Sequence, residues 1–147
     1  MKLKIAWIGK TKDEAIQSLT DEYLKRISRY VDVEPLRLSD ENALLKLREK
    51  NGARPAHTIV LLDSRGKAMS SEEFAEFLAN HQERSGQPLV LAIGPADGFS
   101  KVAREASHSM LSLGKMTLAH ELARVVLLEQ VYRAFTILKG HPYHTGH

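Results

Sequence analysis

Two short apolar runs constrain the fold of this chain more than any other feature of its sequence. His57 to Leu62 and Leu89 to Ile93 are each dominated by consecutive valine, leucine and isoleucine residues. A strand with one face in water alternates apolar with polar residues, so a continuous apolar strand must be covered on both faces. Such strands are typical of a parallel sheet that carries helices on both sides.

The segments around these runs predict further strands and the helices between them. Residue spacing indicates strands at 2–8, 31–38 and 110–113, helices after Thr11, Asp40 and Ser70, and helices at 101–107 and 120–139. Pro35 has no N–H to donate to a neighbouring strand, which places the strand at 31–38 toward an edge of the sheet. The expected fold class is therefore α/β, a mainly parallel sheet with flanking helices.

Helix starts and helix faces give more local predictions. Thr11 with Glu14 and Ser70 with Glu73 match the capping box, in which two side chains satisfy free amides at a helix start. Leu19 belongs to the helically spaced apolar residues of the first helix. The last helix is apolar over most of its circumference, so we expect it to be buried on two sides, by the sheet and by a partner subunit.

Length and composition limit the number of domains and the classes of function that this chain can have. The 147 residues, 43% of them hydrophobic, fit a single domain at 1–147. The chain has no cysteine, which excludes disulfides, zinc ribbons and thiol nucleophiles, and a cytoplasmic location is expected. No run approaches the roughly 20 apolar residues of a membrane span. The net charge of +3 permits a nucleic-acid partner but does not demand one.

Three loops follow predicted strands, at 63–66, 94–98 and 113–118. Ligands of parallel sheets bind where strands end, and glycine allows a ligand to approach the backbone closely. The spacing of Gly94 and Gly98 differs from the dinucleotide fingerprint, which disfavours a nicotinamide cofactor, and the sequence has no phosphate-binding P-loop. From spacing alone, these glycines equally indicate a tight strand-to-helix turn.

The C-terminal tail and the last helix carry candidate catalytic residues. His141, His144 and His147 stand three apart, but the neighbouring glycines and Pro142 make a helix unfavourable there, so no metal site is expected. The tail is either simply solvated or places His144 as an acid or base, since imidazole titrates near neutral pH.

Arg124 lies among apolar residues near the start of the last helix. An arginine in such a setting has two interpretations, which the sequence leaves open. It forms an ion pair with Glu121 or Glu129, or it faces an anion near the helix N-terminus.

Five segments of the chain together resemble those of one protein family. They are TIVLLD at 58–63, LAIGPADG at 91–98, SLGKMTLAH at 112–120, RVVLLEQVYRA at 124–134 and HPYH at 141–144. The chain resembles the ribosomal RNA large subunit methyltransferase H family, of the SPOUT class, over its whole length. The resemblance implies a SPOUT-type C-terminal trefoil knot and a homodimer. It also implies methyl transfer from S-adenosylmethionine to N3 of a pseudouridine in a 23S rRNA hairpin loop, in the large subunit or the assembled ribosome.

The resemblance also implies which residues bind the cofactor. They are Leu62, Gly94, Leu113, Gly114, Lys115, Met116, Thr117 and Leu118. Because S-adenosylmethionine carries no phosphate, its site needs an apolar slot and backbone hydrogen-bonding groups rather than a cationic cradle. The leucines supply the slot, and the glycines supply close backbone.

The same resemblance points to catalytic residues. Methyl transfer requires alignment, and the acceptor nitrogen carries a proton that must leave. His144 is expected to act as base, Arg124 to stabilise the deprotonated uracil edge, and Tyr143 to stack on the target base as the tail closes over it. Two positions depart from the family pattern: Thr145 stands where a basic residue is frequent, and Pro95 replaces a frequent glycine.

Two other functions remain open at this point. One is a SPOUT methyltransferase with a different RNA target, because the cofactor loops would look alike. The other is a non-catalytic module that binds RNA or the ribosome, which suits the small size and slight basic excess. Binding of S-adenosylmethionine separates the enzymes from such a module.

Overall fold

Every neighbouring pair of strands in the sheet runs parallel. The computed structural model describes residues 1–145, and within them five strands pair in the order β2-β1-β4-β3-β5. The strands are β1 (Lys2–Ile8), β2 (Asp32–Leu38), β3 (Thr58–Ala68), β4 (Leu89–Ile93) and β5 (Ser109–Ser112). The α/β class with a mainly parallel sheet is confirmed.

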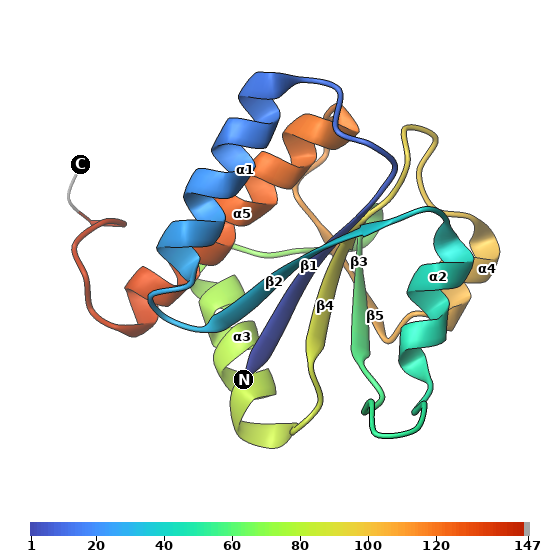
Figure 1. Cartoon of the computed structure of the whole chain (residues 1–147). Helices are drawn as coiled ribbons and strands as arrows, with labels where there is room; N and C mark the ends of the chain where they lie inside the picture. Colours follow the sequence, from blue (N-terminus) through green and yellow to red (C-terminus); the bar gives the residue numbers. More distant parts are fainter. Residues whose placement is uncertain (146–147) are drawn as a thin grey trace.

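Helices cover both faces of this sheet (Figure 1). They are α1 (Glu14–Ile27), α2 (Glu41–Leu45), α3 (Ser71–Arg84), α4 (Lys101–Ala106) and α5 (His120–Leu138), with a short 3₁₀ turn, η1, at Lys46–Arg48. One core cluster joins α1, α3 and α5 to one face of the sheet, and a second joins α2 and α4 to the other. None of the helices in residues 1–145 is long and apolar enough to cross a membrane.

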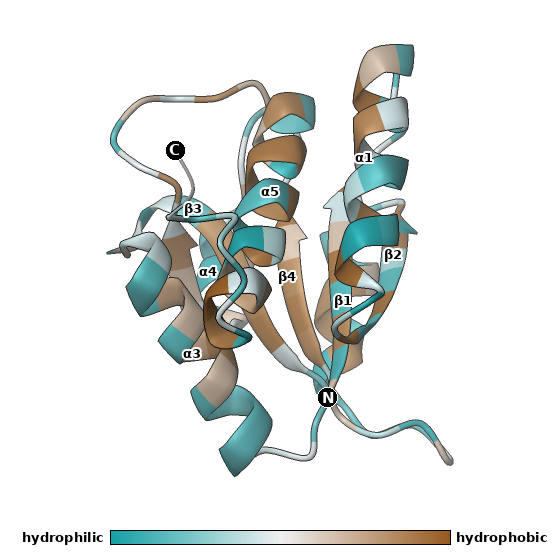
Figure 2. Ribbon diagram, turned by 90° about the vertical axis from the view of Figure 1, so that its left-hand side faces the viewer, coloured by the Kyte–Doolittle hydropathy of each residue, from teal (hydrophilic) through white to brown (hydrophobic). Residues whose placement is uncertain are grey.

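The central strands send alternate side chains into the two cores. In β1, Leu3 and Ile5 belong to the cluster under α1, α3 and α5, whereas Ala6 belongs to the opposite one. All five residues of β4 are buried. Figure 2 shows this apolar character concentrated on the central strands and on α5, with polar residues on the outer helix surfaces. The prediction that the apolar runs are covered on both faces is confirmed.

The edge position of β2 is also confirmed, with Pro35 opposite Ile5. By contrast, the expectation of a loop at 63–66 is wrong. β3 continues to Ala68, and its pairing with β5 shifts register between Leu62 and Lys67. Gly66 permits this course, because a Cβ there would lie 2.5 Å from the backbone carbon of Met110.

The helix starts give one confirmation and one correction. Ser70 and Glu73 form the expected capping box on α3. The capping box predicted from Thr11 and Glu14 is wrong, because α1 begins one residue after Asp13, whose carboxylate accepts a hydrogen bond from the N–H of Ala15 at 2.8 Å. An N-cap aspartate satisfies the same free amides as a capping box.

Some apolar side chains of the outer helices remain at the surface. Leu19 of α1 is 43% exposed, and Leu122 of α5 is 45% exposed. Both belong to the helix pair that packs together on one face of the sheet. The sheet therefore leaves part of this pair without cover in a single chain.

Candidate active site

A cavity of about 290 Å³ opens at the carboxyl ends of β4 and β5 and beside Leu62 to Arg65 in the middle of β3. Open parallel sheets bind their ligands at this edge, and the volume lies near the lower end of the roughly 300–1,000 Å³ usual for ligand sites. The lining residues are Leu62 to Arg65, Ile93 to Gly98, Leu113, Gly114, Met116 to Leu118, His120 and Ala123. Seven of the eight residues expected to bind the cofactor thus surround one cavity, whereas Lys115 is exposed and does not line it.

The loop after β4 forms a thin wall of this cavity. The backbone of Gly94 lies against the ring of Phe99, and a Cβ at Gly94 would come within 3.1 Å of that ring. Gly98 has φ +80° and donates its N–H to the carbonyl of Pro95 at 2.8 Å. The segment is therefore a tight turn that also lines the cavity.

The loop after β5 forms a second wall. The Ser112 hydroxyl accepts a hydrogen bond from the N–H of Gly114 at 3.1 Å and donates one to its carbonyl at 2.9 Å. Gly114 has φ +131°, a conformation that other residues rarely adopt. Met116, at the mouth of the cavity, is 86% exposed. The sharp turn directs the backbone of this loop toward the cavity.

Charged groups on the lining are nearly balanced. The side chain of Asp63 is 6% exposed, accepts a hydrogen bond from the N–H of Arg65 at 2.9 Å, and lies 3.4 Å from the Arg65 guanidinium. Asp97 is the second carboxylate on the lining. Two carboxylates and one guanidinium suit a ligand that carries positive and negative groups, and they disfavour a polyphosphate.

Arg124 does not line this cavity. It is 1% exposed, and its guanidinium lies 4.0 Å from the centre of the Trp7 ring while Nη1 donates to the Thr11 hydroxyl at 2.8 Å. Burial lowers the pKa of Arg124. Within residues 1–145 it forms no ion pair with Glu121 or Glu129, so that interpretation is wrong.

Glu121 binds the same segment that Arg124 binds. Its carboxylate accepts hydrogen bonds from the N–H groups of Lys12 at 3.1 Å and Asp13 at 3.3 Å. Glu121 and Arg124 together fasten the β1–α1 loop to the first turn of α5, next to the cavity residues His120 and Ala123. This placement indicates that Arg124 supports the shape of the site.

The C-terminal tail lies against the second half of α5. The Tyr143 hydroxyl donates to Glu129 at 2.7 Å, and its ring contacts Tyr132 edge-on with centroids 4.7 Å apart. Burial and the bond to Glu129 raise the pKa of Tyr143, so its phenol stays protonated at neutral pH. Burial opposes ionisation of Glu129, but hydrogen bonds from Arg133 and Tyr143 outweigh it and lower the pKa of Glu129.

His144 is held between two charged side chains. Its Nδ1 lies 2.8 Å from Nη1 of Arg133, and its Nε2 lies 2.5 Å from Oε1 of Glu72 on α3. Arginine only donates hydrogen bonds, so Nδ1 accepts and the proton of a neutral ring sits on Nε2, facing Glu72. Both ring nitrogens are engaged, and His144 gains a free lone pair only by leaving the Arg133 contact.

The tail and the cavity occupy opposite ends of α5. Ala123 lines the cavity, whereas Arg133 contacts the tail, and ten helical residues span about 15 Å. Figure 1 shows the tail leaving α5 at the far side of the molecule from the loop after β4. One chain therefore brings the expected cofactor residues together but does not bring Tyr143 and His144 to them.

The residues that bind the tail in the structure are Glu129, Arg133 and Glu72. Glu129 and Arg133 form an ion pair at 2.8 Å with both side chains largely buried. Their signal in the sequence is a pair of opposite charges four residues apart on an otherwise apolar helix. Glu72 had no such signal, because its contact with the tail spans 72 positions.

The described part of the chain contains no set of side chains arranged to bind a metal ion. Residues 1–145 contain no group of three or more histidine or acidic side chains arranged around a common point. His141 instead accepts a hydrogen bond from the N–H of Tyr143 at 3.2 Å. His147, the third of the spaced histidines, lies outside the described residues.

Comparisons with solved structures relate the fold to known methyltransferases. A probable methylase family protein from Haemophilus influenzae Rd KW20 superposes with a TM-score of 0.61 at 11% identity, over 96% of this chain and 69% of that one. The SpoU methyltransferase AviRb from Streptomyces viridochromogenes, in complex with the cofactor AdoMet, gives a TM-score of 0.54 at 15% identity, over 88% of this chain and 56% of that one. At these identities the likeness establishes the fold.

Sequence comparisons identify the family. The family model described as predicted SPOUT methyltransferase matches residues 1–144. A protein of Koribacter versatilis named ribosomal RNA large subunit methyltransferase H is 58% identical over 147 residues, which cover 100% of both chains. These full-length matches, on a fold and a loop-lined cavity of the expected kind, show that the chain belongs to the SPOUT methyltransferase family.

Proposed function

We propose that this chain methylates N3 of a pseudouridine in 23S rRNA with S-adenosylmethionine as the methyl donor. The full-length relative from Koribacter versatilis is named for the large-subunit rRNA, which supports the same class of substrate. The observation that carries the proposal is the cavity in which Leu62, Gly94 and the loop after β5 converge.

The residues of the cavity fit S-adenosylmethionine. Leu62, Leu113 and Leu118 offer apolar surface for a flat ring, and the glycine loops offer backbone donors and acceptors beside it. Asp63 and Asp97 suit the ammonium and sulfonium charges of the ligand. When bound, the cofactor supplies an activated methyl group, so the protein needs to align the acceptor nitrogen with it.

In this proposal a residue of the C-terminal tail removes the proton from N3. His144 acts as the base after its Nδ1 leaves Arg133, because the freed lone pair can then accept the proton. Tyr143 stays protonated and stacks on the target base or donates a hydrogen bond to it.

A second copy of the chain completes the site in this proposal. Tail and cavity lie at opposite ends of α5, so a two-fold dimer along α5 would set the tail of one protomer beside the cavity of its partner. The exposed side chains of Leu19 and Leu122 on the α1–α5 pair support such an interface. We expect light scattering to report a dimer at micromolar concentration, and a monomer would contradict this model.

The position of Arg124 supports a different role from contact with the uracil edge. Its guanidinium is buried between Trp7 and Thr11, out of reach of the cavity. We propose that Arg124 positions the β1–α1 loop at the start of α5. The proposal also includes a single methyltransferase domain at 1–147, a C-terminal trefoil knot and a cytoplasmic location.

The decisive experiment combines binding and product mapping. Calorimetry with S-adenosylmethionine should give micromolar affinity, which a non-catalytic binding module would lack. Ribosomes from cells without this protein should then gain one methyl group, located by mass mapping at N3 of a 23S rRNA pseudouridine. Methylation of another RNA would identify a different target, and no binding of the cofactor would overturn the proposal.

A further inference from the structure

A short basic segment follows α2 at the end of the sheet away from the cavity. Residues 46–54, the basic turn, carry four of the 21 lysines and arginines and one of the 18 acidic residues. The remaining chain has 17 residues of each sign, so the formal net charge of +3 resides in this segment. The four cations are Lys46, Arg48, Lys50 and Arg54.

Hydrogen bonds hold the backbone of the basic turn in one shape. Asn51 and Arg54 exchange backbone hydrogen bonds of 3.1 and 2.9 Å around Gly52, which has φ +58°. Nη2 of Arg54 donates to the carbonyl oxygens of Lys46 at 3.1 Å and Glu49 at 2.7 Å. Arg54 therefore acts mainly inside the turn.

The other three cations of the basic turn point away from its hydrogen-bonded backbone. Lys46, Arg48 and Lys50 are exposed, and within residues 1–145 none of them has a carboxylate partner. Arg48 is anchored through a bond from Nη1 to the carbonyl of Ala106, at the end of α4. An array of unpaired cations on a fixed backbone binds an anion with little loss of conformational entropy.

Nearby histidines respond to this charge. Burial first, and then the charge of Arg48, lower the pKa of His108, and burial with Lys4 and Arg54 lowers the pKa of His57. The charges of Arg48 and Arg54 therefore reach these two histidines, although burial is the larger cause of both shifts. Clustered positive charge of this kind attracts a polyanion.

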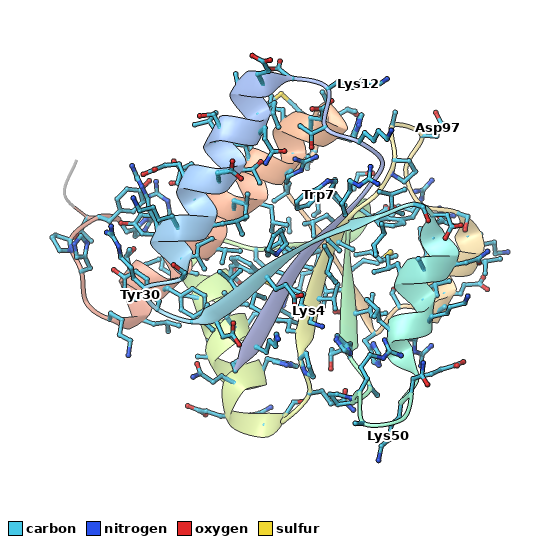
Figure 3. All side chains as sticks on the ribbon, in the orientation of Figure 1. Lys4, Trp7, Lys12, Tyr30, Lys50 and Asp97 are labelled. Atoms are coloured by element: carbon cyan, nitrogen blue, oxygen red, sulfur yellow. The ribbon has the colours of Figure 1, made fainter. Side chains whose placement is uncertain are left out.

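The basic turn is separated from the cavity by the length of the sheet. It precedes β3, whose stretch from Thr58 to Leu62 alone spans about 13 Å before the cavity begins. Figure 3 shows Lys50 at one end of the molecule and Asp97, a cavity residue, at the other. A ligand that touches both must be much larger than one nucleotide.

We infer that the basic turn is a second RNA contact, which binds the phosphate backbone of the ribosomal substrate far from the methylated base. This inference rests on the proposed function for its substrate. Specific protein–DNA interfaces bury about 1,000–2,500 Å² of protein, and an RNA contact of similar extent exceeds the mouth of one small cavity. Phosphate contacts of this kind set affinity and orientation, not chemistry.

The test removes two lysines whose side chains form no hydrogen bond or ion pair within residues 1–145. In the double variant Lys46→Ala, Lys50→Ala we expect at least a five-fold rise in KM for ribosomes, with kcat and cofactor affinity unchanged. Each lost phosphate contact should also reduce the slope of log affinity against log salt by about 0.7. Arg84→Ala, an exposed arginine at the end of α3, is the matched control and should change nothing.

Two results would overturn the inference. One is an unchanged KM and salt slope in the double variant. The other is an effect of Arg84→Ala that equals the effect of the double variant per charge removed, which would show a response to net charge alone. Sedimentation with large ribosomal subunits measures the same contact without methylation. Wild-type protein that binds the subunits through the basic turn, yet transfers no methyl group, would contradict the proposed function and leave this contact standing.

Discussion

Neutralising Glu129 should release the C-terminal tail while leaving the cofactor pocket intact. The Glu129 carboxylate lies 2.8 Å from Nη2 of Arg133 and accepts the hydroxyl of Tyr143 at 2.7 Å. Hydrogen bonds to charged groups contribute about 1.5–3 kcal/mol, roughly twice the value for neutral ones. Glu129→Gln keeps the volume and removes the charge, so it should weaken the docked tail by about 1–2 kcal/mol.

Trypsin cleavage can measure the weaker docking of the tail in Glu129→Gln. A change of 1–2 kcal/mol shifts the ratio of docked to released tail by about 5–30-fold. Trypsin cleavage after Lys139 requires release of the residues beyond it, so the cleavage rate should rise by this factor when opening is faster than cleavage. Methylation of ribosomes should fall by a similar factor, because in the proposed dimer the docked tail lies beside the partner's cavity.

The control is Glu105→Gln, which removes an ion pair with Lys101 whose side chains are 68–80% exposed. Surface pairs of this kind contribute little, so neither rate should change. The affinity for S-adenosylmethionine should stay within two-fold of wild type in both variants. An unchanged trypsin rate in Glu129→Gln, or a ten-fold loss of cofactor affinity, would refute the reasoning.

The cavity, the tail and the buried His57 give further predictions. Gly94→Val should press on the Phe99 ring and Gly114→Val should strain a backbone at φ +131°, and calorimetry should show weaker S-adenosylmethionine binding for both. Deletion of 143–147 should abolish methylation with cofactor affinity within a few-fold, and His144→Ala should lower kcat by about 10²-fold. Burial lowers the pKa of His57 from 6.5, so the unfolded chain binds its proton more tightly, and stability should decline as pH falls below 6.5.

Each of these has a discriminating outcome. If both glycine variants keep wild-type affinity for the cofactor, this cavity is not the cofactor site. Gly86→Val, where a Cβ has open space around it, controls for the substitution itself. A truncated enzyme with normal activity would remove the tail from catalysis. Urea titrations between pH 5 and 7.5 should show a smaller pH dependence for His57→Gln, and an equal dependence would assign it to other groups.

Much of the fold could be predicted because the signals are local. The continuous apolar run of β4 required cover on both faces, Pro35 required an edge, and Ser70 with Glu73 marked the start of α3. Each signal depends on residues within a few positions of one another, where periodicity and capping chemistry act. The meeting of the loops after β4 and β5 at one cavity was predicted in the same way, because parallel strands end at one edge of the sheet.

The course of β3 was less predictable. Asp63 to Gly66 read as a loop, yet the strand continues through an irregular register beside β5. The decisive feature is the close approach of Gly66 to the backbone of Met110, which belongs to another strand. A pairing partner that distant in sequence leaves no local pattern.

The sequence by itself determined the layers of this protein, its central strands and the loops that form the cavity. Only the tertiary structure decided what Thr11, Arg124 and the tail do. Thr11 resembled a helix cap but binds Arg124, 113 positions away, and Arg124 is buried over Trp7 instead of facing a carboxylate. His144 meets Glu72 across 72 positions. Caps and periodicities arise from neighbours along the chain, whereas the partner of a buried charge is set by whichever polar groups the packed elements bring beside it.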